Sequence, residues 1–153
     1  MRVLVTGANG FIGANIVAAL LAAGHRVVCA VRDIKTTALR FPHCEMMAVD
    51  FNRDVHTETW LSRLQNIDAV INCAGVLRGT RQQSIQNIHL LTPQALFQAC
   101  VQAKIASVIQ ISALGIVDNI TEYATSKRAG DEALLALPLN SVVLRPALVV
   151  APG

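Results

Sequence analysis

Short apolar runs of strand length alternate along the chain with longer segments of helical character. The runs that we expect to form strands are residues 3–5, 26–31, 45–49, 69–72, 106–111 and 141–144. The segments that we expect to form helices are residues 11–23, 55–64, 83–103 and 122–137, and the last ends before Pro138. This alternation is typical of repeated βαβ units, in which a helix connects two parallel strands.

The order of these elements predicts one α/β fold. Connections between parallel strands are right-handed, so six such strands favour a doubly wound parallel sheet with the order 3-2-1-4-5-6. Helices then cover both faces, which gives three α/β/α layers. We see no linker, repeat or low-complexity stretch, and we therefore expect residues 1–153 to form one domain.

Composition agrees with a packed aliphatic core and excludes several classes of protein. Hydrophobic residues make up 53% of the chain and aromatic residues only 4%. The formal charge of +3 is too small and too scattered to indicate a nucleic-acid partner. No apolar run approaches the length of a membrane span, and the 4 cysteines show no CxxC pattern. We therefore expect a cytoplasmic protein with reduced thiols and no membrane insertion.

Three glycines, Gly7, Gly10 and Gly13, lie between the first expected strand and the first expected helix. In this position the first glycine permits a tight turn, the second lets the backbone approach a pyrophosphate, and the third allows close packing of helix and strand. The free N–H groups at the start of a helix attract phosphate. We therefore expect this turn to bind a dinucleotide, with contacts that also come from Asn9, Phe11 and Ile12; a glycine-rich turn without ligand is the alternative.

The segment Thr6-Gly7-Ala8-Asn9-Gly10-Phe11-Ile12-Gly13 resembles the opening of the extended and atypical branches of the short-chain dehydrogenase/reductase superfamily. These branches include NAD-dependent epimerases and dehydratases and the NADPH-binding accessory subunit of respiratory complex I. The resemblance covers nearly the whole chain. It implies a Rossmann fold that binds NAD(P) and an oxidoreductase function.

The end of the second expected strand decides which dinucleotide is favoured. The 2′ end of the adenosine ribose is expected about 20 residues beyond the glycines, where Arg32 and Asp33 lie. An arginine favours the 2′-phosphate and an acid favours the free hydroxyl. Because Arg32 comes first, we favour NADP(H), and Asp33 keeps NAD(H) as the alternative.

The resemblance implies further cofactor contacts after the third and fourth strands. Asp50 and Phe51 match an acid and a hydrophobic residue that touch the adenine in the family, although Asp50 is equally suited to cap the following turn. The run Asn72-Cys73-Ala74-Gly75 resembles a family element that packs beneath the cofactor, and Gly75 would keep the backbone clear of the ribose.

Candidate catalytic residues follow the fifth strand. Tyr123 and Lys127 belong to a YxxSK pattern, whose spacing brings both side chains to one face of a helix. A free phenol titrates near pH ~10, so a neighbouring cation is needed before it can serve as an acid or base at neutral pH. The resemblance implies that Ser112 holds the substrate oxygen and that Lys127 also contacts the nicotinamide ribose. It further implies that Asn87 is the structural asparagine of a proton relay.

Other residues receive less specific interpretations. Arg78 and Arg81 are interpreted as solvated loop charges, with contact to an acidic substrate as the alternative. The histidines show no metal-ligand spacing and are interpreted as surface or turn residues; they are His25, His43, His56 and His89.

The stretch from Arg145 to Gly153 resembles the RPxxVxGPG segment of extended members, with Ala151 in place of a glycine. The resemblance implies that a substrate-binding region follows this segment. The sequence ends at Gly153, and we therefore expect that C-terminal region to be absent from this chain.

These observations favour an NADP(H)-dependent oxidoreductase domain that transfers hydride to or from a carbonyl or hydroxyl group of a small-molecule substrate. Two alternatives remain, a non-catalytic dinucleotide-binding module and a nucleotide-sugar epimerase or dehydratase. The short Ser112-Ala113-Leu114-Gly115 segment favours the atypical reductases over the epimerases. The identity of the substrate, the activity of the chain alone and assembly into a homo-oligomer are left open.

Overall fold

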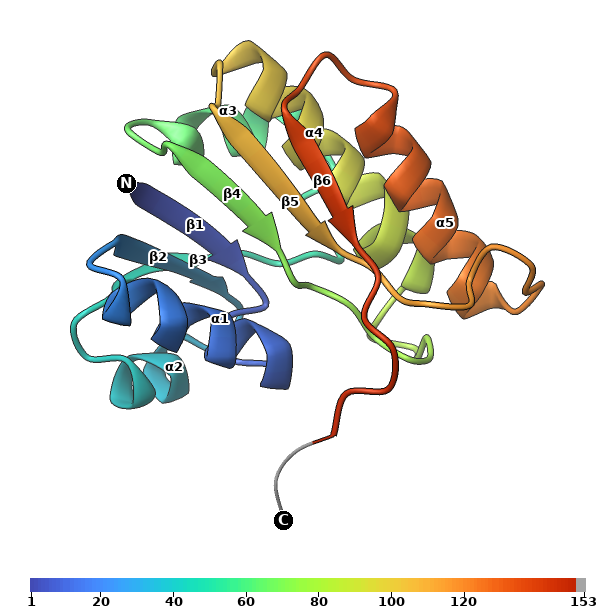
Figure 1. Ribbon diagram of the computed structural model, residues 1–153, viewed down its shortest axis with the longest axis horizontal. Coiled ribbons are helices and arrows are strands. Elements are labelled where there is room, and N and C mark those ends of the chain that lie inside the picture. Colours follow the sequence, from blue (N-terminus) through green and yellow to red (C-terminus); the bar gives the residue numbers. More distant parts are fainter. Residues whose placement is uncertain (151–153) are drawn as a thin grey trace.

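A six-stranded parallel sheet forms the centre of the computed structural model, which describes residues 1–150 (Figure 1). Its strands are β1 (Arg2–Thr6), β2 (Arg26–Val31), β3 (Glu45–Ala48), β4 (Ala69–Asn72), β5 (Ser107–Ile111) and β6 (Ser141–Leu144). They lie in the order β3-β2-β1-β4-β5-β6. The order that the connection rule predicts is therefore confirmed.

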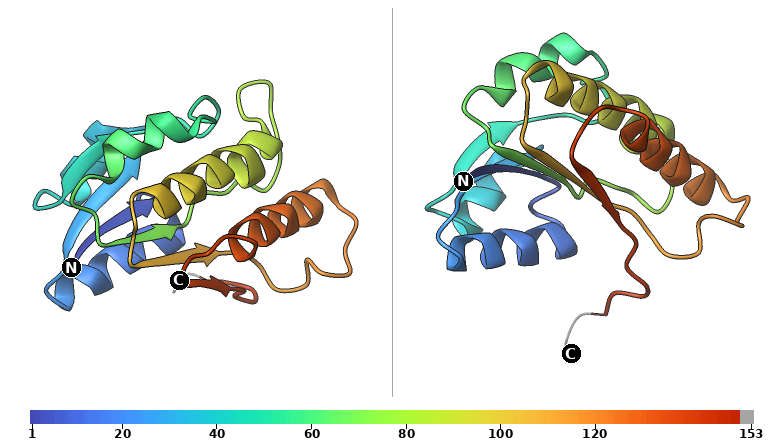
Figure 2. Two further views of the ribbon diagram at one scale, coloured as in Figure 1. Left: turned by 90° about the horizontal axis from the view of Figure 1, so that it is seen from above. Right: turned by 45° about the horizontal axis from the view of Figure 1, so that its top comes forward.

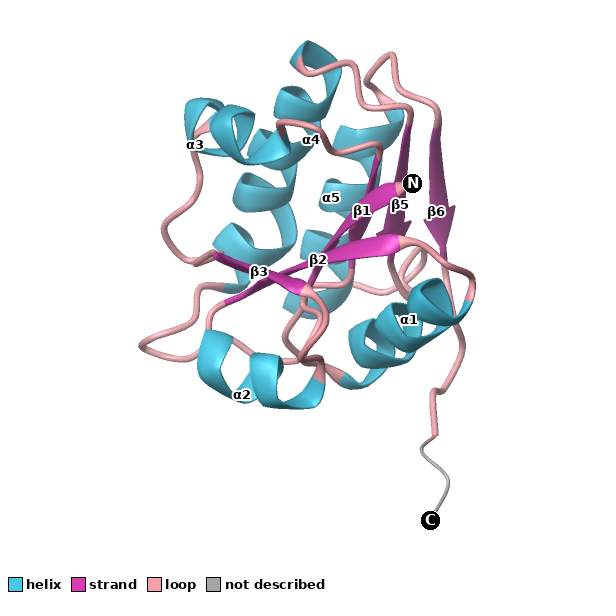
Figure 3. Ribbon diagram, turned by 90° about the vertical axis from the view of Figure 1, so that its left-hand side faces the viewer, coloured by secondary structure: helices cyan, strands magenta, loops and turns pink. Residues whose placement is uncertain are grey.

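Helices cover both faces of the sheet (Figures 2 and 3). They are α1 (Phe11–Ala22), α2 (Ile34–Arg40), α3 (Thr57–Leu61), α4 (Thr92–Gln102) and α5 (Glu122–Leu135). The chain moves outward from β1 to β3 in one direction and from β4 to β6 in the other. Because each connection is right-handed, α1 and α2 lie on one face and α3, α4 and α5 lie on the opposite face. No helix within residues 1–150 is both long enough and apolar enough to span a membrane.

The two faces of the sheet bury separate hydrophobic cores. Alternate side chains of a strand point to opposite faces, so Leu4 packs toward α3, α4 and α5, whereas Val3 and Val5 pack toward α1. Trp60 is fully buried in the first core and Val17 is fully buried in the second. The near-continuous apolar runs of β1, β2 and β4 follow from this burial on both faces, whereas the edge strands β3 and β6 are partly exposed.

Helix α2 was not among the helices that the sequence pattern predicts. Its 7 residues include Thr36 and Thr37, and β-branched residues are weak helix formers. The helix starts because Asp33 caps it: one carboxylate oxygen accepts a hydrogen bond from the Thr36 backbone N–H at 3.1 Å and the other from the Thr36 hydroxyl at 2.7 Å. The sequence of α2 lacks apolar periodicity, and the side-chain cap of Asp33 explains why a helix begins there.

The expected helix over residues 83–103 is shorter and contains an irregular turn. A π-helical turn, η2 (Asn87–Leu91), precedes α4. Such a turn contains one more residue than an α-helical turn, so it rotates the side chains that come before it relative to those that follow. The expected helix over residues 55–64 is likewise divided into α3 and a 3₁₀ turn, η1 (Ser62–Leu64).

Candidate active site

The glycine turn lies at the carboxyl edge of the sheet, between β1 and α1. Gly7 has φ +61°, and a Cβ atom there would lie 2.9 Å from the carbonyl group of Cys73. Gly13 packs directly on the carbonyl oxygen of Gly7, so that a Cβ atom has no room. Gly10 precedes α1, and no side chain of the described residues caps this helix. The first-turn N–H groups of α1 are therefore available to an anion, as a bound pyrophosphate requires.

A buried polar network fixes the neighbouring strand ends. The Thr6 hydroxyl donates to the Asn72 side-chain oxygen at 2.5 Å, and the Asn72 amide donates to Gln110 at 2.7 Å. Thr6 Oγ1 also accepts from the backbone N–H of Cys73 at 3.1 Å. These bonds connect the carboxyl ends of β1, β4 and β5 and position the segment from Cys73 to Gly75 opposite the glycine turn.

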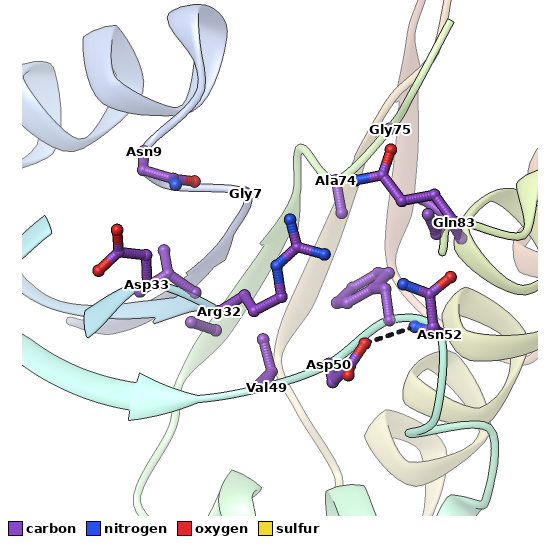
Figure 4. Close-up of a pocket in the computed structure, with 14 residues that line it drawn as sticks. Gly7, Asn9, Arg32, Asp33, Val49, Asp50, Asn52, Ala74, Gly75 and Gln83 are labelled. Carbon is purple, nitrogen blue, oxygen red and sulfur yellow. Dashed lines mark hydrogen bonds between the residues drawn. The ribbon is translucent and has the colours of Figure 1, made fainter. Parts of the chain in front are cut away.

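One pocket at this edge is lined by residues that follow β1, β2, β3 and β4 (Figure 4). The expected cofactor residues that line it are Gly7, Asn9, Arg32, Asp50, Phe51, Ala74 and Gly75. The other seven expected residues lie outside it. Gly10, Phe11, Ile12 and Gly13 belong to the adjoining turn and to the first turn of α1, and Cys73, Tyr123 and Lys127 line a second pocket. The pocket lies where the strand order reverses, the usual position for a ligand of such sheets.

Arg32 and Asp33 have different roles at the end of β2. Figure 4 shows the guanidinium group of Arg32 extending across the pocket, whereas the Asp33 carboxyl group points away from that guanidinium group. Asp33 is the cap of α2, and the hydrogen bonds from Thr36 hold the pKa of its carboxyl group below the usual value. Arg32 is thus the charged side chain from this strand end that reaches over the pocket.

Asp50 lines the pocket and also stabilises its own turn. Its Oδ1 atom accepts a hydrogen bond from the Asn52 backbone N–H at 2.9 Å, so the turn-capping alternative describes its observed contact (Figure 4). Asn52 also lines the pocket, and its side-chain oxygen accepts from the backbone N–H of Ser84 at 2.8 Å. Sequence reasoning missed Asn52 and Gln83, because neither belongs to a recognisable motif.

Asn87 is not brought to the candidate catalytic residues. Its side-chain amide donates to the backbone oxygen of Asn52 at 2.8 Å, beside the pocket at the end of β3. The structure places His89 of the same π-helical turn next to Tyr123 instead, with ring centroids 5.5 Å apart in an edge-to-face arrangement. The residue expected to form the relay thus lies elsewhere, and its neighbour His89 occupies the position beside the tyrosine.

His89 is only 1% exposed, so its interpretation as a surface or turn residue is wrong. Nε2 accepts a hydrogen bond from the backbone N–H of Val76 at 3.1 Å, so the ring proton lies on Nδ1. Nδ1 is 2.7 Å from Ser126 Oγ, which in turn donates to the backbone oxygen of Tyr123 at 3.0 Å. His89 therefore connects the segment after β4 to the helix that carries Tyr123.

Ser112, Tyr123 and Lys127 line one pocket together with Cys73 and Gly75. Lys127 is 5% exposed, and its ammonium group donates to the Ile111 backbone oxygen at 2.9 Å. Gly75 lines this pocket and the pocket of Arg32 alike. The expected catalytic residues other than Asn87 therefore share one pocket, and that pocket adjoins the expected dinucleotide pocket.

Burial acts against the charged forms of the tyrosine and the lysine. It raises the pKa of Tyr123, with a further contribution from the Asp131 carboxylate, and it lowers the pKa of Lys127, an effect that Asp131 opposes. The pKa of the Cys73 thiol is raised to about 12, mainly by burial. The pocket by itself therefore favours the neutral phenol, which is the proton-donating form.

The sheet order, the switch point and the glycine turn are those of a dinucleotide-binding α/β protein. The model of the NAD dependent epimerase/dehydratase family matches residues 3–153, and the chain belongs to this family. The family and the fold confirm the resemblance that the glycine turn indicates. The stretch Ala151 to Gly153 lies outside the residues that the structure describes.

Several known proteins are similar to this chain. A ceramide reductase from Caulobacter vibrioides is 28% identical over 99% of the chain and 47% of its own length. A dTDP-6-deoxy-L-talose 4-dehydrogenase (NAD(P)(+)) from Kitasatospora kifunensis is 33% identical over 99% of the chain and 54% of its own length. The chain thus spans about half the length of these curated relatives.

Solved structures show the same fold. A putative NAD-dependent epimerase/dehydratase from Bacillus halodurans superposes with a TM-score of 0.82 and 27% identity, over 96% of this chain and 70% of that one. MoeE5, solved in complex with UDP-glucose and NAD, has a TM-score of 0.75 and 26% identity over 95% of this chain and 54% of its own.

Proposed function

We propose that the chain is the cofactor-binding part of an NADP(H)-dependent oxidoreductase that acts on a carbonyl or hydroxyl group of a small molecule. The observation that carries this proposal is the shared position of Gly75, which lines both the Arg32 pocket and the pocket of Ser112, Tyr123 and Lys127. A cofactor that extends from one pocket to the other would bring its reactive end to the tyrosine.

A bound nicotinamide dinucleotide would supply or accept the hydride. The N–H groups at the start of α1 would hold its pyrophosphate, and Gly7 and Gly13 keep that approach free of side chains. Tyr123 Oη would give a proton to the substrate oxygen or take one from it. The positive charge of Lys127 favours the phenolate that results when Tyr123 gives up its proton.

Two side chains at the end of β2, Arg32 and Asp33, support the preference for NADP(H). Arg32 presents planar N–H donors that match a phosphate, and its guanidinium group extends over the pocket (Figure 4). Asp33, which would accept hydrogen bonds from the 2′-hydroxyl of NAD(H), already accepts two bonds from Thr36. The acid that argues for NAD(H) is therefore engaged in capping α2.

Parallel titrations with NADPH and with NADH, in which nucleotide fluorescence reports binding, test this preference. In Arg32→Ala the affinity for NADPH should fall about tenfold or more, because a hydrogen bond to a charged group contributes about 1.5–3 kcal/mol, and the affinity for NADH should change little. Arg40→Ala is the matched control, because Arg40 is exposed at the last turn of α2 and does not line the pocket. Equal affinities that Arg32→Ala leaves unchanged would contradict the NADP(H) preference.

Membership of the family favours a second candidate, a nucleotide-sugar epimerase or dehydratase. MoeE5 was solved with UDP-glucose, and the Kitasatospora relative is named as a dTDP-sugar dehydrogenase. An epimerase or a dehydratase, unlike a dehydrogenase, regenerates its cofactor within one catalytic cycle and therefore retains it through purification. Absorbance and mass spectrometry of the purified protein distinguish the two candidates: retained NAD supports the second, and nucleotide that exchanges freely supports the reductase.

A further inference from the structure

The carboxyl group of Asp131 is buried directly behind the candidate catalytic side chains. Asp131 is 0% exposed, and its Oδ2 atom accepts a hydrogen bond from Ser112 Oγ at 2.6 Å. The Arg145 guanidinium group, whose side chain is 38% exposed, lies 3.4 Å from the same oxygen. Oδ1 has no hydrogen-bond partner among residues 1–150. A buried carboxylate that leaves one oxygen unpaired is costly, which indicates a role beyond packing.

The spacing along α5 places Asp131 on the face that carries the other two groups. Tyr123, Lys127 and Asp131 follow one another at intervals of four residues, so their side chains lie along one stripe of the helix. The buried ammonium group of Lys127 donates to a backbone oxygen, which carries no net charge. An ammonium group that is removed from water needs an opposite charge nearby, and Asp131 supplies one from the next turn.

No other neighbour supplies a negative charge to Lys127 within the described chain. The titratable and charged groups around it are Tyr123 and Asp131 on α5, Cys73 after β4, His89 on η2 and Arg145 after β6. Burial keeps His89 neutral and the Cys73 thiol protonated at neutral pH. Tyr123 is neutral until it gives up its proton, and Arg145 is positive.

The bond from Ser112 to Asp131 also orients the serine hydroxyl. Ser112 has a single hydroxyl proton, and it is donated to Asp131 rather than into the pocket. The oxygen of Ser112 therefore presents its lone pairs to the pocket. Of the two hydroxyl groups that line this pocket, that of Tyr123 remains available as a proton donor.

We propose that Asp131 is a positioning residue, the buried counter-charge that keeps Lys127 protonated and that turns the hydroxyl proton of Ser112 away from the substrate. This inference rests on the proposed function in one respect: the proposed reaction is the reason why Lys127 needs its positive charge. It predicts that Ser112 meets a substrate as a hydrogen-bond acceptor while Tyr123 alone of the two hydroxyls donates.

The test measures the titration of Lys127 directly, by NMR of the chain with ¹³C-labelled lysine. The sequence contains only three lysines, Lys35, Lys104 and Lys127, so the signals can be assigned by substitution. In Asp131→Asn the titration midpoint of Lys127 should fall, by about one pH unit for a nearby opposite charge, because the charge of Asp131 raises the pKa of Lys127 and asparagine carries no charge. Glu132→Gln removes an exposed carboxylate from the same helix and should leave the midpoint unchanged.

The direction of the shift separates loss of charge from loss of structure. Unfolding would move the Lys127 midpoint upward, toward the value of about 10.4 for a free lysine, and would change the fluorescence of the buried Trp60. An Asp131→Asn protein that stays folded while its Lys127 midpoint stays in place or rises would overturn the proposal.

A measurement on the unaltered chain covers the case in which Asp131→Asn does not fold. Protonation of Asp131 as the pH falls should shift the Lys127 signal while the Trp60 fluorescence stays native. The absence of such a shift, with Asp131 seen to titrate, would also overturn the inference. Because both titrations are read without cofactor, failure to bind NADPH would count against the proposed function and leave the role of Asp131 standing.

Discussion

His89 is neutral inside the fold because burial, with a smaller effect of the charge on Lys127, lowers the pKa of its imidazole to about 4. Its Nε2 atom accepts a hydrogen bond from the Val76 N–H, and its Nδ1 atom is hydrogen-bonded to Ser126 Oγ. Protonation would place a second N–H group against the Val76 N–H, and the connection between the segment after β4 and α5 would break. The protonation state of one side chain therefore affects the position of Tyr123.

The predicted consequence is a loss of stability in mild acid. The folded pKa of His89 lies below its unfolded value of about 6.5, so the unfolded state binds the proton more readily. The contribution to the free energy of unfolding is complete above about pH 6.5 and is lost as the pH falls toward about 4, by roughly 3 kcal/mol in all. Urea unfolding at several values of pH measures this slope.

In His89→Gln the slope over that range should become flatter, because the glutamine side chain does not titrate. His43→Gln is the matched control. Because His43 is exposed, this variant should keep the slope of the unaltered chain. An equal slope in His89→Gln and the unaltered chain would show that other groups cause the acid sensitivity.

At the scale of single elements, the turn from β1 to α1 depends on the absence of a side chain at Gly13. We expect Gly13→Ala to move α1 away from Gly7 and to lower the affinity for NADPH tenfold or more, because the N–H groups at the start of the helix would leave the phosphate position. Fluorescence titration measures the affinity, and circular dichroism checks the fold.

Gly24→Ala provides the comparison for this turn. Gly24 ends α1 with φ +81°, and nothing lies within 4 Å of a Cβ atom there. The alanine should therefore destabilise the fold by about 1–2 kcal/mol through its left-handed backbone while NADPH affinity stays unchanged. Similar losses of affinity in both variants would indicate a general effect of stability instead of a local effect at the phosphate site.

The elements with strong periodicity could be predicted from sequence, and those set by a single local contact could not. The strands 26–31 and 69–72 coincide with the observed ones because continuous apolar runs require burial on both faces. Strand 141–144 also coincides, although Val142 and Leu144 of this edge strand are exposed. Helix α2 depends on the Asp33 cap. The positions of Asn87 and His89 could not be predicted, because a π-helical turn, which no residue pattern here reveals, determines which residue of the segment faces Tyr123.

The burial of Asp131 could not be predicted from the sequence for a related reason. Four residues beyond Lys127, an aspartate on a helix is usually a solvated charge, and only the packing of α5 against the sheet shows that it is buried against Ser112. The shared pocket of Tyr123 and Lys127 could be predicted because their spacing of four residues brings both side chains to one face of a helix. The burial of Asp131 instead depends on a contact between α5 and the end of β5, which are distant in sequence.

For the whole molecule, the fold predicts that cofactor binding stabilises the native state by mass action. At a free NADPH concentration of 100 times its Kd, the free energy of unfolding should rise by about 2.7 kcal/mol. Trp60 is the one tryptophan of the sequence and is fully buried, so its fluorescence reports unfolding directly. Thermal unfolding with NADPH, with NADH and without nucleotide should rank the midpoints in that order, and identical midpoints would contradict dinucleotide binding.

The reversal of strand order between β1 and β4 divides the chain into two halves that meet at one seam. The first half contributes the glycine turn, Arg32 and Asp50, and the second contributes Gly75, Tyr123 and Lys127. A dinucleotide bound over the seam would contact residues of both halves and stabilise their association. If the chain were cut in the connection that leads from β3 to α3, the two fragments should reassemble more readily with the nucleotide present, and the molecule could then serve as a split reporter of its own ligand.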